Sequence, residues 1–259
     1  MKTKLNQSTE TRTSRGIQSV EVGGQLLKAL AFKGQRMALK DLAKAADMTP
    51  AKAHPYLVSF GKIGLIEQDP VSGHYGLGSL AIQLGLISLQ QVDPVRLAIA
   101  ALPALAQEVG ATVSAAIWGS HSPIIIRVEE SPTPVHISMR HGTPASIKHT
   151  GTGKIFAAFG DPKMVALALA NEGLDGESLD AQFAKELHEI RKQGLASVRD
   201  ELMTGISAMA VPVFDGFGHL ALAIATIGPT ALLDLAPQSQ QSQALIKCGK
   251  ALSQKLGSI

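Results

Sequence analysis

Residues 38–78 have the sequence ALKDLAKAADMTPAKAHPYLVSFGKIGLIEQDPVSGHYGLG and decide the fold of the N-terminal part. Apolar residues recur at helical spacing in its first part, which predicts a short amphipathic helix with an inward face of Leu39, Leu42, Ala43 and Ala46. Thr49 and Pro50 then begin a second helix, because a threonine hydroxyl caps free backbone amides and proline suits the first helical position. This second helix has an inward stripe of Ala53, Leu57 and Phe60, and Gly64 is expected to end it.

A predicted hairpin follows the second helix. Two short apolar segments, 65–67 and 74–77, flank residues 69–73, whose Asp-Pro-Val-Ser-Gly sequence is typical of a turn. Two helices and a hairpin in about 40 residues predict a winged helix-turn-helix, whose second helix enters the DNA major groove. That recognition helix is expected from residue 50 to about residue 63, and the residues that we expect to contact bases or phosphates are Thr49, Ala51, Lys52, His54, Tyr56, Ser59 and Lys62.

Pro55 conflicts with the predicted recognition helix. A proline inside a helix removes one hydrogen bond and clashes with the carbonyl four residues earlier, at a cost of roughly 3 kcal/mol. If the helix begins nearer Ala51 or Lys52, Pro55 falls in the first turn and most of this cost disappears. In either case this position lacks a side chain that could contact a phosphate or a base.

Three segments carry a resemblance to the isocitrate-lyase-regulator (IclR) family of bacterial transcription factors. Residues 49–78 resemble the DNA-binding domain of that family. Residues 142–159, GTPASIKHTGTGKIFAAF, resemble the segment that enters a helix of its effector-binding domain, and residues 205–229, GISAMAVPVFDGFGHLALAIATIGP, resemble its closing hairpin. Two separate signatures in the family's order are more specific than a helix-turn-helix pattern alone. The resemblance implies a ligand-responsive regulator that binds operator DNA as a dimer or tetramer and is not an enzyme.

The composition fits a protein of this class. A chain of 259 residues with 45% hydrophobic and 17% charged residues predicts an ordered protein, most simply of two domains. Cys248 is the single cysteine, which excludes an intramolecular disulfide and a cysteine-based metal cluster. The N-terminus is polar and the longest apolar runs are too short to span a bilayer, so we expect a cytoplasmic protein without a membrane partner.

Positive charge is concentrated in the N-terminal part. Residues 1–90 contain 11 Lys and Arg against 6 Asp and Glu, a net of +5, whereas residues 91–259 contain 13 against 15, a net of −2. A basic surface is what contact with DNA phosphates requires. Residues 1–16 are interpreted as a disordered arm in which Arg15 either reaches a minor groove or stays solvated. The expected domains are this arm, a winged helix-turn-helix at 17–78, a linker helix at 79–92 and an effector-binding domain at 93–259.

Helices and strands are also expected outside the opening segment. A helix at 17–32 should bury Val20, Leu27 and Leu30 and end at Gly34. Residues 79–89 form an apolar helix that, by the resemblance, also pairs subunits, and a further helix at 94–110 should be interrupted or kinked at Pro103. Strands are expected at 112–118, 124–129, 135–140, 195–200, 207–214 and 219–227, and helices at 153–159, 162–171, 180–193 and 238–256. This order predicts an α+β domain with a largely antiparallel sheet and flanking helices, and the resemblance implies a GAF-like fold.

Catalytic, metal and cofactor motifs are absent from the sequence. Residues 205–209 lack the second glycine of a nucleophile elbow, and His188-Glu189 lacks the second histidine of a zinc-protease helix. Gly151-Thr152-Gly153-Lys154 is not a phosphate-binding loop, because Lys148 stands where that motif needs glycine and Ile155 replaces its Ser or Thr. We therefore expect no cofactor, no bound metal and no catalytic residues.

Residues 150–153 still predict an anion site, because they lead into a helix whose first amides and dipole favour negative charge. A turn that only reverses the chain is the alternative. The residues expected to bind the effector are Met139, His149, Thr150, Gly151, Thr152, Glu201, Met203, Ala208, Met209 and Thr226. Some relatives place cysteine or serine at the positions of Met209, Ala225 and Ile227. Apolar residues there predict a less polar ligand than a small oxo acid, such as an aromatic or longer-chain acid.

A second function is also compatible with the sequence. Pro55 could deprive the helix of specific DNA recognition and leave a small-molecule-binding sensory or interaction protein. A gel shift with the intergenic DNA beside its own gene, repeated at raised salt, separates this function from that of a DNA-binding regulator.

Overall fold

The computed structural model describes residues 16–131, 133, 136–174 and 181–258. The chain divides into two compact units between Gln91 and Val92. Each unit has its own hydrophobic core and is described separately.

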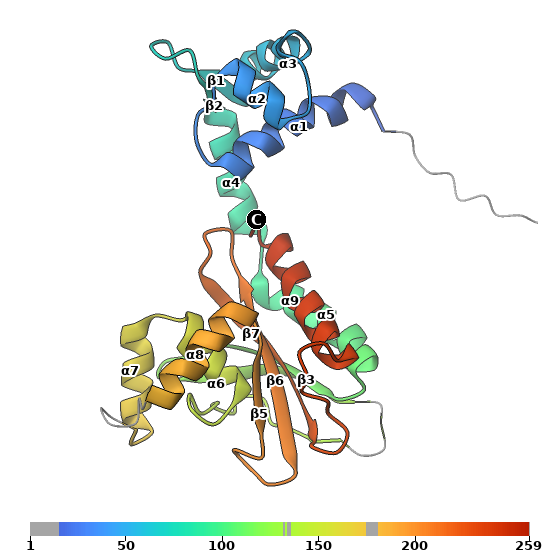
Figure 1. The fold of residues 1–259 in the computed structure, drawn as a ribbon, viewed down its shortest axis with the longest axis vertical. Helices are drawn as coiled ribbons and strands as arrows, with labels where there is room; N and C mark the ends of the chain where they lie inside the picture. The colour runs from blue at the N-terminus through green and yellow to red at the C-terminus, as the bar shows by residue number, and fades with distance from the viewer. Residues whose placement is uncertain (1–15, 132, 134–135, 175–180, 259) are drawn as a thin grey trace, which may run out of the picture. The chain divides into compact units, whose positions relative to one another are not determined.

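The N-terminal unit is a winged helix-turn-helix (Figure 1). Three helices precede a two-stranded antiparallel hairpin and a fourth helix. Their bounds are α1 (Gln18–Lys33), α2 (Leu39–Ala45), α3 (Pro50–Lys62), β1 (Ile66–Gln68), β2 (Tyr75–Leu77) and α4 (Ser79–Gln91). The core between them contains Leu26, Leu30, Leu42, Ala53, Leu57 and Ile66. The predicted fold of this part is therefore confirmed.

The first helix ends as expected and buries Leu30 as predicted, whereas Leu27 is partly buried and Val20 is exposed. Gly34 takes the left-handed conformation, with φ 65°, and its amide donates to the Leu30 carbonyl. Leu26, Ala29 and Leu30 form the buried stripe of α1 at helical spacing. Val20 lies off that stripe and is 66% exposed, so the expectation that it is buried is wrong.

The C-terminal unit is an antiparallel five-stranded sheet with helices on both faces (Figure 1). The strand order is β4-β3-β7-β6-β5, and every neighbouring pair is antiparallel. In chain order the elements are α5 (Pro94–Val109), β3 (Thr112–Trp118), β4 (Pro123–Glu129), α6 (Gly151–Phe159), α7 (Pro162–Asn171), α8 (Ala181–Gln193), β5 (Ala196–Arg199), β6 (Ile206–Phe214), β7 (Leu220–Pro229) and α9 (Gln240–Lys255). This arrangement confirms the predicted fold class.

The two faces of the sheet bury different kinds of side chain. Large residues such as Met209, Val211 and Ile224 pack with α5 and α9. The other face, towards α6 and α8, carries alanines on its central strands, namely Ala116, Ala210, Ala223 and Ala225, and Ala196 on the edge strand β5. Small side chains let a helix approach closely, and a Cβ added at Gly151 of α6 would lie 3.4 Å from Ala210.

One local expectation for this unit is wrong, and another is wrong in part. Residues 136–140 form no strand, while residues 134–135 lie outside the described residues. The alternation of apolar residues there has another cause, since Ile137 and Met139 both border a cavity. The helix α5 continues through Pro103, which is exposed, so the interruption expected there is absent.

Candidate DNA interface and ligand cavity

The start of the candidate recognition helix is fixed by Thr49. Its hydroxyl accepts a hydrogen bond from the Lys52 amide at 3.3 Å, and Pro50 is the first helical residue. Pro55 is therefore the sixth residue of α3 and lies in its second turn, so the possibility that it falls in the first turn is wrong. Because proline has no amide hydrogen, the Ala51 carbonyl lacks its usual helical partner.

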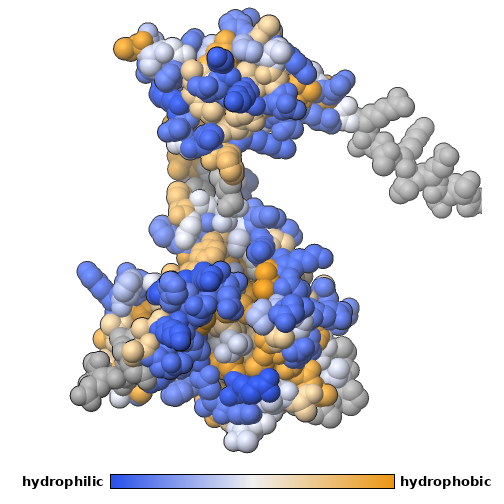
Figure 2. Space-filling view, viewed as in Figure 1, coloured by the Kyte–Doolittle hydropathy of each residue, from blue (hydrophilic) through white to orange (hydrophobic). Residues whose placement is uncertain are grey.

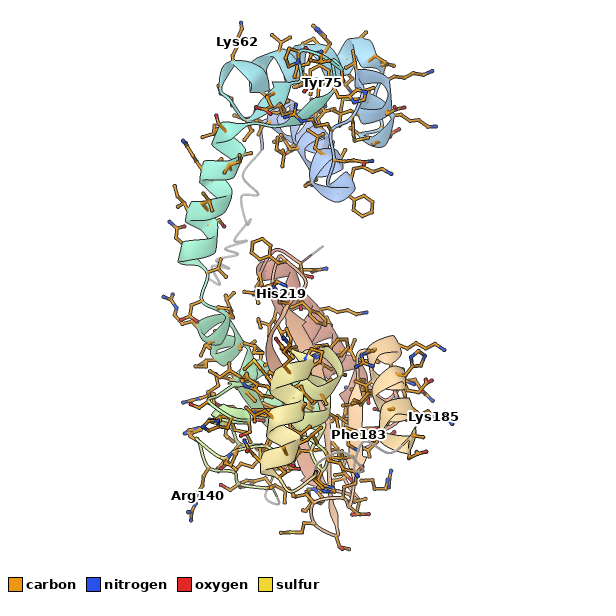
Figure 3. All side chains as sticks on the ribbon, turned by 90° about the vertical axis from the view of Figure 1, so that its left-hand side faces the viewer. Lys62, Tyr75, Arg140, Phe183, Lys185 and His219 are labelled. Carbon is orange, nitrogen blue, oxygen red and sulfur yellow. The ribbon has the colours of Figure 1, made fainter. Side chains whose placement is uncertain are left out.

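The outward face of α3 carries most of the residues predicted to contact DNA. Ala51, Lys52, His54, Ser59 and Lys62 are exposed, while Ala53 and Leu57 are buried beneath them. Lys62 extends away from the unit (Figure 3). The Ser59 hydroxyl, however, donates to the Pro55 carbonyl at 2.9 Å. Arg15, also predicted to contact DNA, lies outside the described residues.

Tyr56 does not lie on this outward face, which corrects its expected position. It is half-buried and packs against the core of the N-terminal unit. A Cβ added at Gly23 of α1 would lie 2.9 Å from its ring. The glycine therefore makes room for Tyr56 where α1 and α3 meet.

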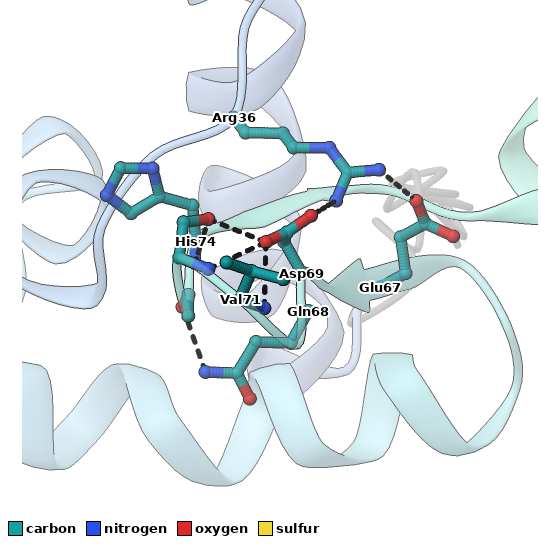
Figure 4. Close-up of polar contacts among 8 residues, drawn as sticks. Arg36, Glu67, Gln68, Asp69, Val71 and His74 are labelled. Atoms are coloured by element: carbon teal, nitrogen blue, oxygen red, sulfur yellow. Dashed lines mark hydrogen bonds and ion pairs between the residues drawn. The ribbon is translucent and has the colours of Figure 1, made fainter.

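The hairpin after α3 is organised by Asp69 (Figure 4). Its carboxylate accepts from the Ser72 amide at 2.7 Å, the Ser72 hydroxyl at 2.9 Å and the Val71 amide at 3.1 Å. These bonds, first of all that of the Ser72 amide, hold the pKa of the Asp69 carboxyl below its ordinary value. Asp69 is therefore ionised at neutral pH and fixes the turn.

Arg36 pairs with both carboxylates of this hairpin (Figure 4). It donates to Asp69 at 3.3 Å and forms an ion pair with Glu67. The guanidinium offsets part of the negative charge that these two carboxylates give the hairpin. No local sequence pattern indicates this contact, since the partners are 31 and 33 residues apart.

A cavity of about 270 Å³ lies in the C-terminal unit, between the sheet, the start of α6 and two loops. Eight of the ten residues predicted for the effector border it, namely Met139, His149, Thr150, Gly151, Thr152, Met203, Ala208 and Thr226. Further residues that were not predicted include Ser114, Ile125, Ile137, Thr143 and Val198. The walls are predominantly apolar, with the helix start as a polar end.

Met209 and Glu201 do not border the cavity, unlike the other eight residues predicted for the effector. Neighbouring residues in a strand point to opposite faces, so Met209 points away when Ala208 faces the cavity. Its sulfur accepts a hydrogen bond from the Ser242 hydroxyl of α9 at 3.0 Å. Thr226 pairs with Met209 across the strands and shares its face, so only the Thr226 backbone borders the cavity.

The first turn of α6 supplies the polar end of the cavity. The Thr150 hydroxyl caps the helix by accepting from the Gly153 amide at 2.9 Å. The first helical hydrogen bond runs from the Lys154 amide to the Thr150 carbonyl. The Gly151 and Thr152 amides precede that bond, so they and the helix dipole are free to bind an anion. His149 adds an exposed ring beside them.

A buried ion-pair cluster anchors one wall of the cavity. The Lys154 side chain is 2% exposed, and its ammonium donates to Glu186 at 2.6 Å and to both Glu201 oxygens at 2.8 Å. Glu201 belongs to the loop that carries Leu202 and Met203 to the cavity. Glu201 therefore supports the cavity through Lys154 and does not line it.

Metal-binding clusters, the single cysteine and membrane-spanning helices were considered for the described residues. No cluster of three His, Cys, Asp or Glu side chains in the described part of the chain could hold a metal ion. Burial raises the pKa of the Cys248 thiol, and Glu108 adds to this, so Cys248 is a weak nucleophile. None of the described helices is long and apolar enough to cross a membrane.

Comparison with known proteins gives matches over both units. Residues 19–70 match the family model "IclR helix-turn-helix domain", and residues 87–254 match "Bacterial transcriptional regulator IclR C-terminal". The glycerol operon regulatory protein of Streptomyces griseus is 29% identical, covering 94% of this chain and 98% of its own. The transcriptional repressor IclR of Escherichia coli is 25% identical over 93% of this chain and 90% of its own. The crystal structure of Pseudomonas aeruginosa HmgR has a TM-score of 0.84 and 30% identity, covering 93% of this chain and 99% of that one.

Proposed function

This chain belongs to the IclR family of bacterial transcription regulators, and we propose that an organic acid bound in its C-terminal cavity controls the binding of operator DNA by its N-terminal unit. Members of this family are regulators and not enzymes. A ligand that prefers one arrangement of the C-terminal unit shifts the population of arrangements, and with it the affinity for DNA. We place this activity in the cytoplasm, where the DNA is.

The proposed DNA interface is the outward face of α3 together with its hairpin. Lys52 and His54 near the start of α3 are in position to read base edges, and Lys62 at its end suits a phosphate. The Thr49 cap fixes the start of α3, and the ion pairs of Arg36 fix the hairpin. The net charge of +5 over residues 1–90 favours contact with a polyanion.

The helix α4 supports a proposal of self-association. It has no charged residue, and Ile82, Leu84, Leu86 and Ile87 are each more than half exposed. Figure 2 shows apolar surface over this helix. An exposed apolar helix of this kind marks an interface. We propose a homodimer or homotetramer formed through α4, which would read a pseudo-palindromic operator because its symmetry matches that of the DNA site.

The size and lining of the cavity support our proposal for the chemical class of the effector. A cavity of about 270 Å³ lies just below the roughly 300–1,000 Å³ of most ligand pockets, so it suits a compact ligand. The α6 amides suit a carboxylate, and Ala208, Ala225 and Ile227 suit an apolar body. These groups together favour an aromatic or longer-chain acid over a two- or three-carbon oxo acid.

Calorimetry and thermal melting test this choice directly. Aromatic and longer aliphatic acids should raise the melting temperature, because a ligand that binds only the folded state stabilises it. Glyoxylate and pyruvate serve as small polar comparisons. Tight binding of these two beside poor binding of the apolar acids would refute the proposed class.

Replacing Lys62 with alanine tests the DNA interface. We expect weaker binding to all duplexes and a decrease of about 1 in the slope of log affinity against log salt, because each lost phosphate contact removes released counterions. The measurement is a fluorescence titration of a duplex from the intergenic region beside the gene, at several salt concentrations. Lys185 of α8 is an exposed lysine in the other unit (Figure 3), and Lys185→Ala controls for the change of charge. Equal slopes for both variants would remove Lys62 from the interface.

A further inference from the structure

Ser114 is a polar residue of the cavity that a carboxylate at α6 does not explain. It lies in β3, borders the cavity and is 1% exposed. Its partners on the neighbouring strands are Val128 and Ala225. Directly opposed residues of antiparallel strands share a face, and both partners belong to the core beneath α6 and α8. The Ser114 side chain therefore points to the cavity side of the sheet.

The Ser114 hydroxyl is uncommitted, unlike most others at the cavity. Hydroxyls of the surrounding residues donate within the protein, Thr143 to the Arg140 carbonyl and Thr150 to the Ser146 carbonyl, and Ser207 pairs with Thr230. Within the part of the chain that the structure describes, the Ser114 side chain has no hydrogen-bond partner. Its oxygen is not one of the fully enclosed side-chain atoms without a partner, which among the described residues are Trp118 Nε1 alone, so it opens into the cavity, where a bound molecule can reach it.

A bound water is a poor partner for this hydroxyl. An ordered buried water makes about three hydrogen bonds to polar groups. The residues beside Ser114 on this face are Val128 and Ala225, and Ile125 also borders the cavity. These three side chains offer a water no hydrogen bonds, so an oxygen held in place by a bound ligand is the better partner.

On the basis of the proposed acid-binding function, we propose that Ser114 is a specificity residue that binds a second oxygen on the effector. The carboxylate docks at the Gly151 and Thr152 amides of α6, and Ser114 reaches the ligand from the sheet. The start of α6 thus binds the carboxylate of the ligand, and the sheet binds its second oxygen. The effector class is a carboxylic acid that carries a hydroxyl or carbonyl oxygen on its apolar body, in place of a plain hydrocarbon acid.

Matched pairs of acids test this assignment. The probes are benzoate, phenylacetate and their ortho, meta and para monohydroxylated counterparts, titrated calorimetrically into the full-length protein and into Ser114→Ala. One net hydrogen bond contributes about 0.5–1.5 kcal/mol, so the best hydroxylated acid should bind about 2- to 10-fold tighter than its parent. In Ser114→Ala this advantage should disappear while the affinity for the parent acid is retained.

Ser207→Ala is the control variant, because Ser207 is a buried serine of the same sheet whose hydroxyl already pairs with Thr230 at 2.9 Å. It should keep the preference for the hydroxylated acid. Acids that bind without such a preference, or a preference that survives in Ser114→Ala, would overturn the role of Ser114 and leave the acid-binding function standing. If no acid binds the wild-type protein, the proposed effector class fails and the role of Ser114 fails with it.

Discussion

Replacing Lys154 with methionine is expected to lower the free energy of unfolding of the C-terminal unit by about 3 kcal/mol. The Lys154 ammonium is buried and is held by Glu186 and Glu201. Removing one partner of a buried ion pair costs roughly 3–5 kcal/mol, because the charge left behind has lost its compensation. Here the two carboxylates that remain are about one-third exposed, so water relieves part of the cost and the lower end of that range applies.

Thermal unfolding measures this effect. One kcal/mol shifts the melting temperature of a domain of this size by roughly 2–4 °C, so the transition of the C-terminal unit should fall by roughly 6–12 °C. Methionine keeps the length of the lysine stem without its charge, so lost packing contributes little. A melting temperature equal to that of the wild type would show that the cluster does not stabilise the unit.

Glu186→Gln and Glu201→Gln form a matched pair for the same cluster. Each removes one carboxylate and leaves Lys154 with the other, so both should be milder than Lys154→Met. They differ in what they release. Glu201 holds the loop that carries Leu202 and Met203 to the cavity, whereas Glu186 belongs to α8. Ligand affinity should therefore decrease in Glu201→Gln more than in Glu186→Gln, and the reverse order would contradict this role of the loop.

The parts of the fold that the sequence predicts are those set by neighbouring residues. The Thr49 cap, the terminating Gly34 and the turn at residues 69–73 all act within a few residues of their partners. The Lys154 cluster joins residues 32 and 47 positions apart, and no local pattern indicates that pairing. The strand expected at 135–140 was a wrong prediction for a related reason. Apolar and polar residues can alternate in a loop that covers a cavity, as they do in a strand.

The misplacement of Met209 has its origin in strand geometry. Both Ala208 and Met209 were expected at the ligand wall, although successive side chains of a strand point to opposite faces. Applying the period of two strictly would have left one of them. The same rule, applied to β3, places Ser114 opposite to Val113 and Ala115, both of which belong to the core under α5 and α9. Deciding which face is hollow, however, requires the packing of α6 against the alanines of the sheet.

Replacing Pro55 with alanine is expected to stabilise the N-terminal unit by about 2 kcal/mol. Proline costs roughly 3 kcal/mol more than alanine in a helix interior, and Pro55 lies in the second turn of α3. Alanine restores an amide that can donate to the Ala51 carbonyl. It also makes the unfolded chain more flexible, which offsets the gain by about 0.4–1 kcal/mol.

Hydrogen exchange of the slowest amides in α1 and α3 measures this change in the full-length protein, because it separates the N-terminal unit from the other. A gain of about 2 kcal/mol corresponds to roughly 30-fold slower exchange. The control is Pro50→Ala in the same helix. Pro50 is the first helical residue, where no hydrogen bond is lost, so its replacement should destabilise the unit by less than about 1 kcal/mol. Effects of the same sign and size in both variants would show that the position of the proline is immaterial.

The Pro55→Ala variant also distinguishes a regulator that recognises specific DNA from a sensor protein without specific DNA recognition. The substitution changes no charge, so the salt dependence of DNA binding should equal that of the wild type. Pro55 is exposed on α3, three residues after Lys52 and four before Ser59, so its ring shares their face of the helix. If wild-type protein prefers one duplex over others, the rigid proline is compatible with recognition. If only Pro55→Ala gains such a preference, the proline has been suppressing specific binding, and the protein acts chiefly as a sensor of its ligand.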